Sequence, residues 1–322
     1  MLLDVRLDAD LPAVPAAVAA LEDAGAGGVF TYEGPGDPFL PLGLAAVGSS
    51  RLALYTNLAV ALPRSPMHLA YLAQDLQRAS GGRFSLGLGT QVKAHVTRRF
   101  GGTWESPVEQ LREWVLAVRA IQRSWETGTP LDFRGRWTEH TYCPPLFVPP
   151  AAPAAPILVG ALGPRMTAMA VESADGLLVH PFCTDASVAA MLADVPPGFP
   201  VVGQAIVAVA QDEEQAATAR AAVRSLVAFY ASTPAYRRVL DVHGWGDLQG
   251  ELRDLTRAGR WDELPAAVPD EVLEEIAVTG TPAEVAAGLA RRFARCERVA
   301  LSTPYRLPVD ALAALVDAAR NA

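Results

Sequence analysis

Three ionisable residues stand where apolar runs of the sequence end. Glu33 closes one such run, His180 closes another, and His95 follows a third by a few residues. An imidazole titrates near neutral pH, and a carboxylate can exchange a proton when its surroundings raise its pKa. We therefore take Glu33, His95 and His180 as candidate catalytic residues for proton transfer to a small molecule. The alternative for each histidine is a hydrogen-bonded packing role.

The stretch SGGRFSLGLGTQ, residues 80–91, combines a turn, an alternating strand and a strand end that lacks side chains at Gly87 and Gly89. A ligand can approach the main chain of a glycine more closely than that of any other residue. The pattern indicates a flat ligand held against the end of this strand. A bend in a crowded strand is the alternative.

A second glycine-containing turn joins a strand to a helix. Its helix continues with an apolar face through Met166 and Met169. The first amides of a helix are free to bind an anion, so the turn predicts a phosphate site, with a plain helix start as the alternative. The residues assigned to this site are Gly160, Ala161, Leu162, Gly163 and Arg165.

Lys93, Arg98 and Arg99 form a small basic cluster beyond the glycine-rich strand. It is either a solvated loop or a second site for an anionic ligand. Lys93 is also the only lysine in the chain, and therefore the only candidate for a Schiff-base aldolase. Its place on a loop argues against the buried amine with a lowered pKa that such an enzyme needs.

Composition excludes several other classes of protein. The net charge is -8, which argues against binding to nucleic acid or to an anionic membrane surface. The N-terminus is acidic and no apolar run approaches the length of a membrane span, so we expect a cytoplasmic protein. Cys143, Cys183 and Cys296 are far apart and lack the spacing of metal ligands, so no metal site is expected.

Short apolar runs alternate with amphipathic stretches along the chain, which is typical of β-α units around a parallel sheet. The apolar positions Val108, Leu111, Val115 and Val118 show helical spacing after the fourth run. Eight strands predict a (β/α)8 TIM barrel, with its chemistry at the carboxyl ends of the strands. The expected strands are 1–7, 27–33, 52–60, 83–90, 155–161, 176–182, 201–210 and 298–305.

We expect residues 1–322 to form one barrel domain interrupted by two segments. A hairpin and a proline-rich connector are predicted near residues 131–155, and a helical excursion near residues 223–278. Before the last strand, Thr281 and Glu284 have the spacing of a capping box, which predicts where that helix begins.

Four segments carry a resemblance to a known family. These are SGGRFSLGLGT, PRSPMHLAYLAQDLQRAS, PILVGALGPRMTAMAVESADG and GTPAEVAAGL, which together span most of the chain. Their order and spacing resemble the bacterial luciferase-like superfamily, and most closely its branch that uses coenzyme F420, a deazaflavin with an anionic tail. The resemblance implies a TIM barrel with inserted segments and hydride transfer between the ring and an organic substrate.

The resemblance also implies where the ring lies. It places the ring against the end of the glycine-rich strand, facing a bulge in the preceding strand that often contains a non-prolyl cis peptide, here Asn57-Leu58. Relatives carry an Asp-His pair near the end of the second strand, which this chain lacks; Tyr32 and Glu33 stand there instead. The implied ring contacts are Tyr32, Asn57, Leu58, Gly89, Thr90 and Gln91.

The sequence therefore predicts a coenzyme F420-dependent oxidoreductase that acts on a small organic molecule. One alternative is an FMN-dependent monooxygenase of the same superfamily, which would use reduced flavin and oxygen. A non-catalytic flavin-binding barrel is the other alternative, because fold does not fix function. The substrate, the direction of hydride transfer and assembly into a homodimer stay open.

Overall fold

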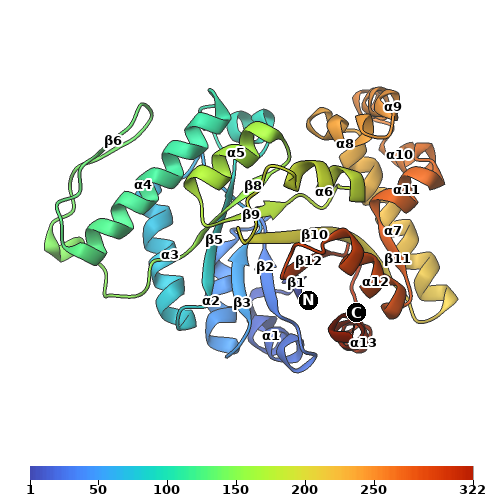
Figure 1. Ribbon diagram of the computed structural model, residues 1–322, viewed down its shortest axis with the longest axis horizontal. Coiled ribbons are helices and arrows are strands. Elements are labelled where there is room, and N and C mark those ends of the chain that lie inside the picture. Colours follow the sequence, from blue (N-terminus) through green and yellow to red (C-terminus); the bar gives the residue numbers. More distant parts are fainter. Residues whose placement is uncertain (322) are drawn as a thin grey trace.

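The computed structural model describes residues 1–321, and its strands form a closed parallel barrel with helices outside it (Figure 1). The last strand pairs with the first, which closes the ring. All eight predicted strands are present, so the predicted TIM barrel is confirmed. In order around the ring they are β1 (Leu2–Arg6), β2 (Gly28–Thr31), β3 (Ala53–Thr56), β5 (Phe84–Gly89), β8 (Ile157–Ala161), β9 (Gly176–Val179), β10 (Val201–Val209) and β12 (Arg298–Ser302).

The surrounding helices bury the faces that their spacing predicts. In the fourth helix Leu111, Val115 and Val118 are fully buried. In the helix before the last strand, Thr281 and Glu284 form the predicted capping box. The helices of the outer layer are α1 (Val14–Asp23), α2 (Phe39–Gly48), α3 (Pro66–Ser80), α4 (Pro107–Thr127), α5 (Pro164–Ser173), α6 (Asp185–Leu192), α12 (Pro282–Arg292) and α13 (Val309–Asn321).

A bulge interrupts the third strand. Tyr55 of β3 pairs with Ser85, and Ala59 of the short strand β4 (Ala59–Val60) pairs with Leu88, so one side advances by one residue more than the other. The Thr56 hydroxyl bridges the gap by donating to the Gly87 carbonyl at 2.7 Å and accepting from the Gly87 amide at 2.9 Å. The bulge thus changes the direction of the chain after Thr56, so that the following residues are directed toward the mouth of the barrel.

The first inserted segment is an antiparallel hairpin of β6 (Phe133–Arg134) and β7 (Glu139–His140), as predicted. It projects away from the barrel beside α4 (Figure 1). A 3-10 turn, Pro145–Phe147, and an extended proline-rich connector lead from it to β8. The amides of Arg136, Trp137 and Thr138 donate to the Glu113 carboxylate, which holds the hairpin turn against α4.

The second inserted segment begins at Glu213, earlier than the expected start near residue 223. Asp212 accepts a hydrogen bond from the Gln215 amide at 2.8 Å and so caps a helix that the sequence pattern placed too late. The segment comprises α7 (Glu213–Ala231), α8 (Arg237–Asp241), α9 (Gly246–Arg257), α10 (Leu264–Ala267), α11 (Asp270–Ile276) and the strand β11 (Val278–Gly280), with short 3-10 turns at Pro234–Tyr236 and Trp261–Glu263.

This helical segment packs over the end of β10. Ile206 and Ala208 of the strand share a buried apolar cluster with Phe182 and with Val223 and Val227 of α7. The burial of these side chains fixes the segment against one side of the barrel mouth. Within residues 1–321 no helix is long and apolar enough to cross a membrane.

Candidate active site

The peptide bond between Asn57 and Leu58 is cis, at the position in the bulge that the family resemblance implies. The Leu58 side chain fills the space beside two glycines. A β-carbon would lie 2.6 Å from Leu58 Cδ2 at Gly89 and 2.3 Å from it at Gly160. The expectation that Gly89 leaves room directly for a ligand is therefore wrong: the glycines make room for Leu58, which covers this end of the barrel.

Asn57 reaches across the barrel to the opposite wall. Its Nδ2 donates to Gln204 Oε1 of β10 at 3.1 Å, and both side chains are buried. The Asn57 amide also donates to the Thr31 carbonyl of β2 at 2.6 Å. These bonds hold the bulge between two strands, and Gln204 is a member of the site that the sequence did not reveal.

Glu33 is locked in a buried ion pair with Arg64. Its two oxygens accept from Arg64 at 2.5 and 2.9 Å, and one of them also accepts from the Val60 amide at 3.0 Å. Its own amide donates to the Leu58 carbonyl at 3.0 Å. Because both oxygens already have partners, the geometry favours a role in holding the bulge over proton exchange with a substrate.

His180 lies at the end of β9 with its ring between two tyrosines. Its ring stacks on Tyr236 with 4.3 Å between centroids and meets the edge of Tyr230 at 5.0 Å. Burial lowers the pKa of His180 to about 3, so the imidazole is neutral at neutral pH. The Phe182 amide donates to Nδ1 at 3.1 Å, which places the single ring proton on Nε2. His180 can therefore donate one hydrogen bond to a ligand oxygen.

The two tyrosines beside His180 were not predicted from the sequence. Tyr230 ends α7 and Tyr236 stands in the turn before α8. Burial raises the pKa of Tyr236 to about 12 and raises that of Tyr230 well above its usual range, where Tyr236 adds to the effect. Both phenols therefore stay protonated and can donate hydrogen bonds. Tyr32, at the end of β2, is 47% exposed, with the Arg6 guanidinium over its ring.

The loop after β5 carries the remaining predicted ring contacts. Gln91 has a φ of +59°, which is uncommon for a residue with a side chain, and its Oε1 accepts from the Val92 amide at 3.1 Å. Thr90 donates to the Gln91 carbonyl at 3.2 Å. Both side chains thus shape the loop itself. His95 lies further on, exposed, with Nδ1 3.5 Å from Arg99 Nη1.

The turn before α5 presents free amides, as the prediction of an anion site requires. Gly163 precedes the helix without a side-chain cap, and the amides of Arg165 and Met166 find no acceptor within residues 1–321. The Arg165 side chain lies elsewhere, because it is 77% exposed and pairs with Glu109 of α4 at 2.6 Å. The Arg165 guanidinium therefore does not lie at the predicted anion site.

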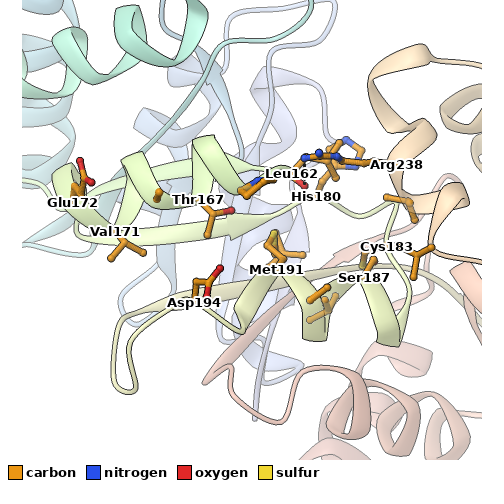
Figure 2. A pocket seen from close by; sticks show the side chains of 17 residues that line it. Leu162, Thr167, Val171, Glu172, His180, Cys183, Ser187, Met191, Asp194 and Arg238 are labelled. Carbon is orange, nitrogen blue, oxygen red and sulfur yellow. Dashed lines mark hydrogen bonds between the residues drawn. The ribbon is translucent and has the colours of Figure 1, made fainter.

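Arg238 of α8 supplies the cation at this turn. A β-carbon on Gly163 would lie 1.7 Å from Arg238 Nη1, so the guanidinium occupies the space that the glycine leaves. Arg238 Nη1 also lies 3.4 Å from the Leu162 carbonyl, to which it donates. Arg238 and His180 line one cavity, and Figure 2 shows them close together with Leu162.

The basic residues predicted as a second anion site lie in the segment that follows β5. Lys93 lies exposed on the loop after β5, whereas a Schiff-base lysine acts from a desolvated pocket. Among residues 1–321, Lys93, Arg98 and Arg99 form no ion pair with a carboxylate. Lys93 and Arg98 are exposed, whereas the Arg99 guanidinium donates to the Gly34 carbonyl. The described part of the chain contains no group of three side chains that could hold a metal ion.

Comparison with known proteins identifies the family. The model of the luciferase-like monooxygenase family matches residues 4–296. The chain belongs to this family. It is 42% identical over 313 residues to an uncharacterized protein of Mycobacterium tuberculosis, covering 92% of this chain and 91% of that protein. It is 30% identical over 238 residues to a 5,10-methylenetetrahydromethanopterin reductase of Archaeoglobus fulgidus, covering 69% and 67%.

Solved structures share the fold. The coenzyme F420 dependent tetrahydromethanopterin reductase of Methanopyrus kandleri superposes with a TM-score of 0.81 at 19% identity, covering 99% of this chain and 98% of that one. The oxygenating constituent of the 3,6-diketocamphane monooxygenase of Pseudomonas putida, in complex with FMN, superposes with a TM-score of 0.64 at 16% identity, covering 95% and 90%. At these identities the likeness shows that the fold is shared.

Proposed function

We propose that this protein is a coenzyme F420-dependent oxidoreductase that transfers a hydride between the deazaflavin and a small organic molecule. The observation that carries the proposal is the cationic turn formed by Arg238 and the free amides of Arg165 and Met166. It stands at a strand end of an otherwise acidic protein, and the mouth of a TIM barrel is where such folds bind their ligands.

The residues present fit such a cofactor. A phosphate at the turn would meet two amides and the Arg238 guanidinium, and the anionic tail would find the uncompensated charges of Lys93 and Arg98. Leu58 offers an apolar surface for the ring, with Asn57 and Gln204 fixed beneath it. When bound, the deazaflavin would supply a hydride carrier that does not readily react with oxygen.

His180 is the residue best placed to act on the substrate. As a neutral imidazole it can donate its Nε2 proton in a hydrogen bond to a substrate oxygen, and it can stabilise negative charge that develops there. The stacked Tyr236 and the edge of Tyr230 fix the ring orientation. His95 is exposed and keeps its predicted role only as a second candidate for proton transfer.

An FMN-dependent monooxygenase is the second candidate, and the presence of such enzymes in the family favours it. FMN carries one phosphate, which the turn alone would satisfy. The longer anionic tail of coenzyme F420 would use the additional charges of Lys93 and Arg98. For that reason we expect coenzyme F420 to bind more tightly than FMN at low salt, with a difference that shrinks as salt screens exposed charges.

Two adjacent arginines test the assignment of the turn. Loss of a charged hydrogen bond costs about 1.5 to 3 kcal/mol, so Arg238→Gln should weaken coenzyme F420 binding by about tenfold or more. Arg237→Gln is the matched control, because Arg237 pairs with Asp241 on the same helix and should leave affinity unchanged. Fluorescence titration of the cofactor measures both. Equal affinities in the two variants would refute the phosphate site.

A further inference from the structure

We propose that a groove between α5 and α6 binds an elongated, uncharged apolar portion of the substrate. This inference rests on the proposed function, because it assigns the reacting end of that substrate to His180. The cavity has a volume of about 490 Å³, within the range of small-molecule sites. Figure 2 shows α5 and α6 on either side of the groove, with side chains of both helices directed toward it.

The groove exists because α6 is held away from α5. Asp185, at the first turn of α6, accepts from Arg291 at 2.8 Å and from Arg292 at 2.6 Å, both on α12. The Arg292 guanidinium is anchored further by the Ile276 carbonyl at 2.7 Å. These ion pairs hold the start of the short helix α6 against α12. The groove lies on the side of α6 that faces α5.

The lining of this groove is largely apolar and includes a flexible side chain. Met191 contributes a flexible thioether that can fit ligands of different shape. The floor includes the Cys183 thiol, and burial raises the pKa of that thiol to about 12, so it carries no charge. The apolar side chains that line the groove are Leu162, Val171, Val179, Val188 and Met191.

The two ends of the groove differ in charge. His180 and Arg238 lie at the end beside the mouth, while Glu172 and Asp194 lie toward the other end (Figure 2). Glu172 pairs with Arg112 at 3.0 Å, whereas Asp194 has no ion-pair partner within residues 1–321. A carboxylate at the far end of a ligand would approach these acids, so the groove disfavours a chain that ends there in an anion. An uncharged chain meets no such repulsion.

The test compares two neighbouring alanines of α6. Ala190 lines the groove and Ala189 is exposed on the same helix without lining it. The neutral fluorophore N-phenylnaphthylamine, added to the full-length protein without cofactor, should bind saturably to the wild type and to Ala189→Trp. It should bind about tenfold or more weakly to Ala190→Trp, because the indole fills the apolar space. Octanol should displace the probe at lower concentration than octanedioate, whose second carboxylate would lie beside Glu172 and Asp194.

A second variant and a second readout complete the design. Ala168→Trp blocks the groove from the α5 side and should weaken binding of the probe to the same extent. It replaces Ala190→Trp as the test if that variant does not fold. Octanol should also shift the imidazole resonances of His180, because its hydroxyl would lie at that end. Equal probe affinity in the blocking and control variants, preferential binding of octanedioate, or no shift at His180 would overturn the inference. No cofactor is needed, so these results are independent of whether the protein uses coenzyme F420.

Discussion

Replacing His180 by phenylalanine should remove a pH dependence of stability that this residue creates. The ordinary pKa of histidine is about 6.5, while burial lowers that of His180 to about 3 in the folded protein. Between these values the unfolded chain binds a proton that the folded protein does not, so the free energy of unfolding falls as the pH falls from 6.5 toward 3. At 1.36 kcal/mol for each pKa unit, protonation of this residue in the unfolded chain lowers the free energy of unfolding by about 2 kcal/mol between pH 7 and pH 5.

Urea unfolding at pH 7 and pH 5 measures this contribution. His180→Phe keeps an aromatic ring against Tyr236 but cannot titrate, so its free energy of unfolding should fall by about 2 kcal/mol less than that of the wild type over the same change of pH. His68→Phe is the matched control, because His68 is exposed on α3 and should leave the pH dependence as it is. If His180→Phe and the wild type lose equal stability on acidification, His180 is not the buried neutral imidazole described above.

Two further predictions concern the bulge. Glu33→Gln removes the charge that pairs with Arg64, which keeps Asp37 as a partner, and should lower the free energy of unfolding by about 1.5 to 3 kcal/mol in urea unfolding, whereas a loss below about 0.5 kcal/mol would show that the pair is not what holds the bulge. Gly89→Val should lower both the melting temperature and cofactor affinity because the new side chain collides with Leu58, and adding Leu58→Ala should restore much of the melting temperature; a double variant as unstable as the single one would contradict that packing.

Local patterns were sufficient to predict the barrel. Apolar runs and helical spacing are set by neighbours in sequence, so the eight strands, the hairpin after α4 and the capping box of Thr281 and Glu284 could be read directly. The start of the helical segment was placed too late because Asp212, its cap, precedes a stretch of alanines and glutamates without a strong apolar period.

The site was harder to predict because its contacts join residues far apart in the chain. Arg238 reaches the turn at Gly163 from a separate helix, and no local pattern distinguishes it from Arg165, which pairs with α4 instead. Likewise, Gly87 and Gly89 indicated a close approach, but only the path of the bulge shows that the Thr56 carbonyl approaches Gly87 and that the Leu58 side chain approaches Gly89. Tyr236 meets His180 solely through tertiary packing.

Binding of a deazaflavin at the mouth of this barrel can be measured by a parallel titration of the purified protein with coenzyme F420 and with FMN at low salt, followed by turnover of each reduced cofactor with and without oxygen. We expect tighter binding of coenzyme F420, an affinity that falls as salt screens the exposed charges over about 10 Å at 0.1 M, and turnover that does not need oxygen. FMN binding about tenfold more tightly, together with oxygen-dependent turnover, would contradict it and identify a flavin monooxygenase.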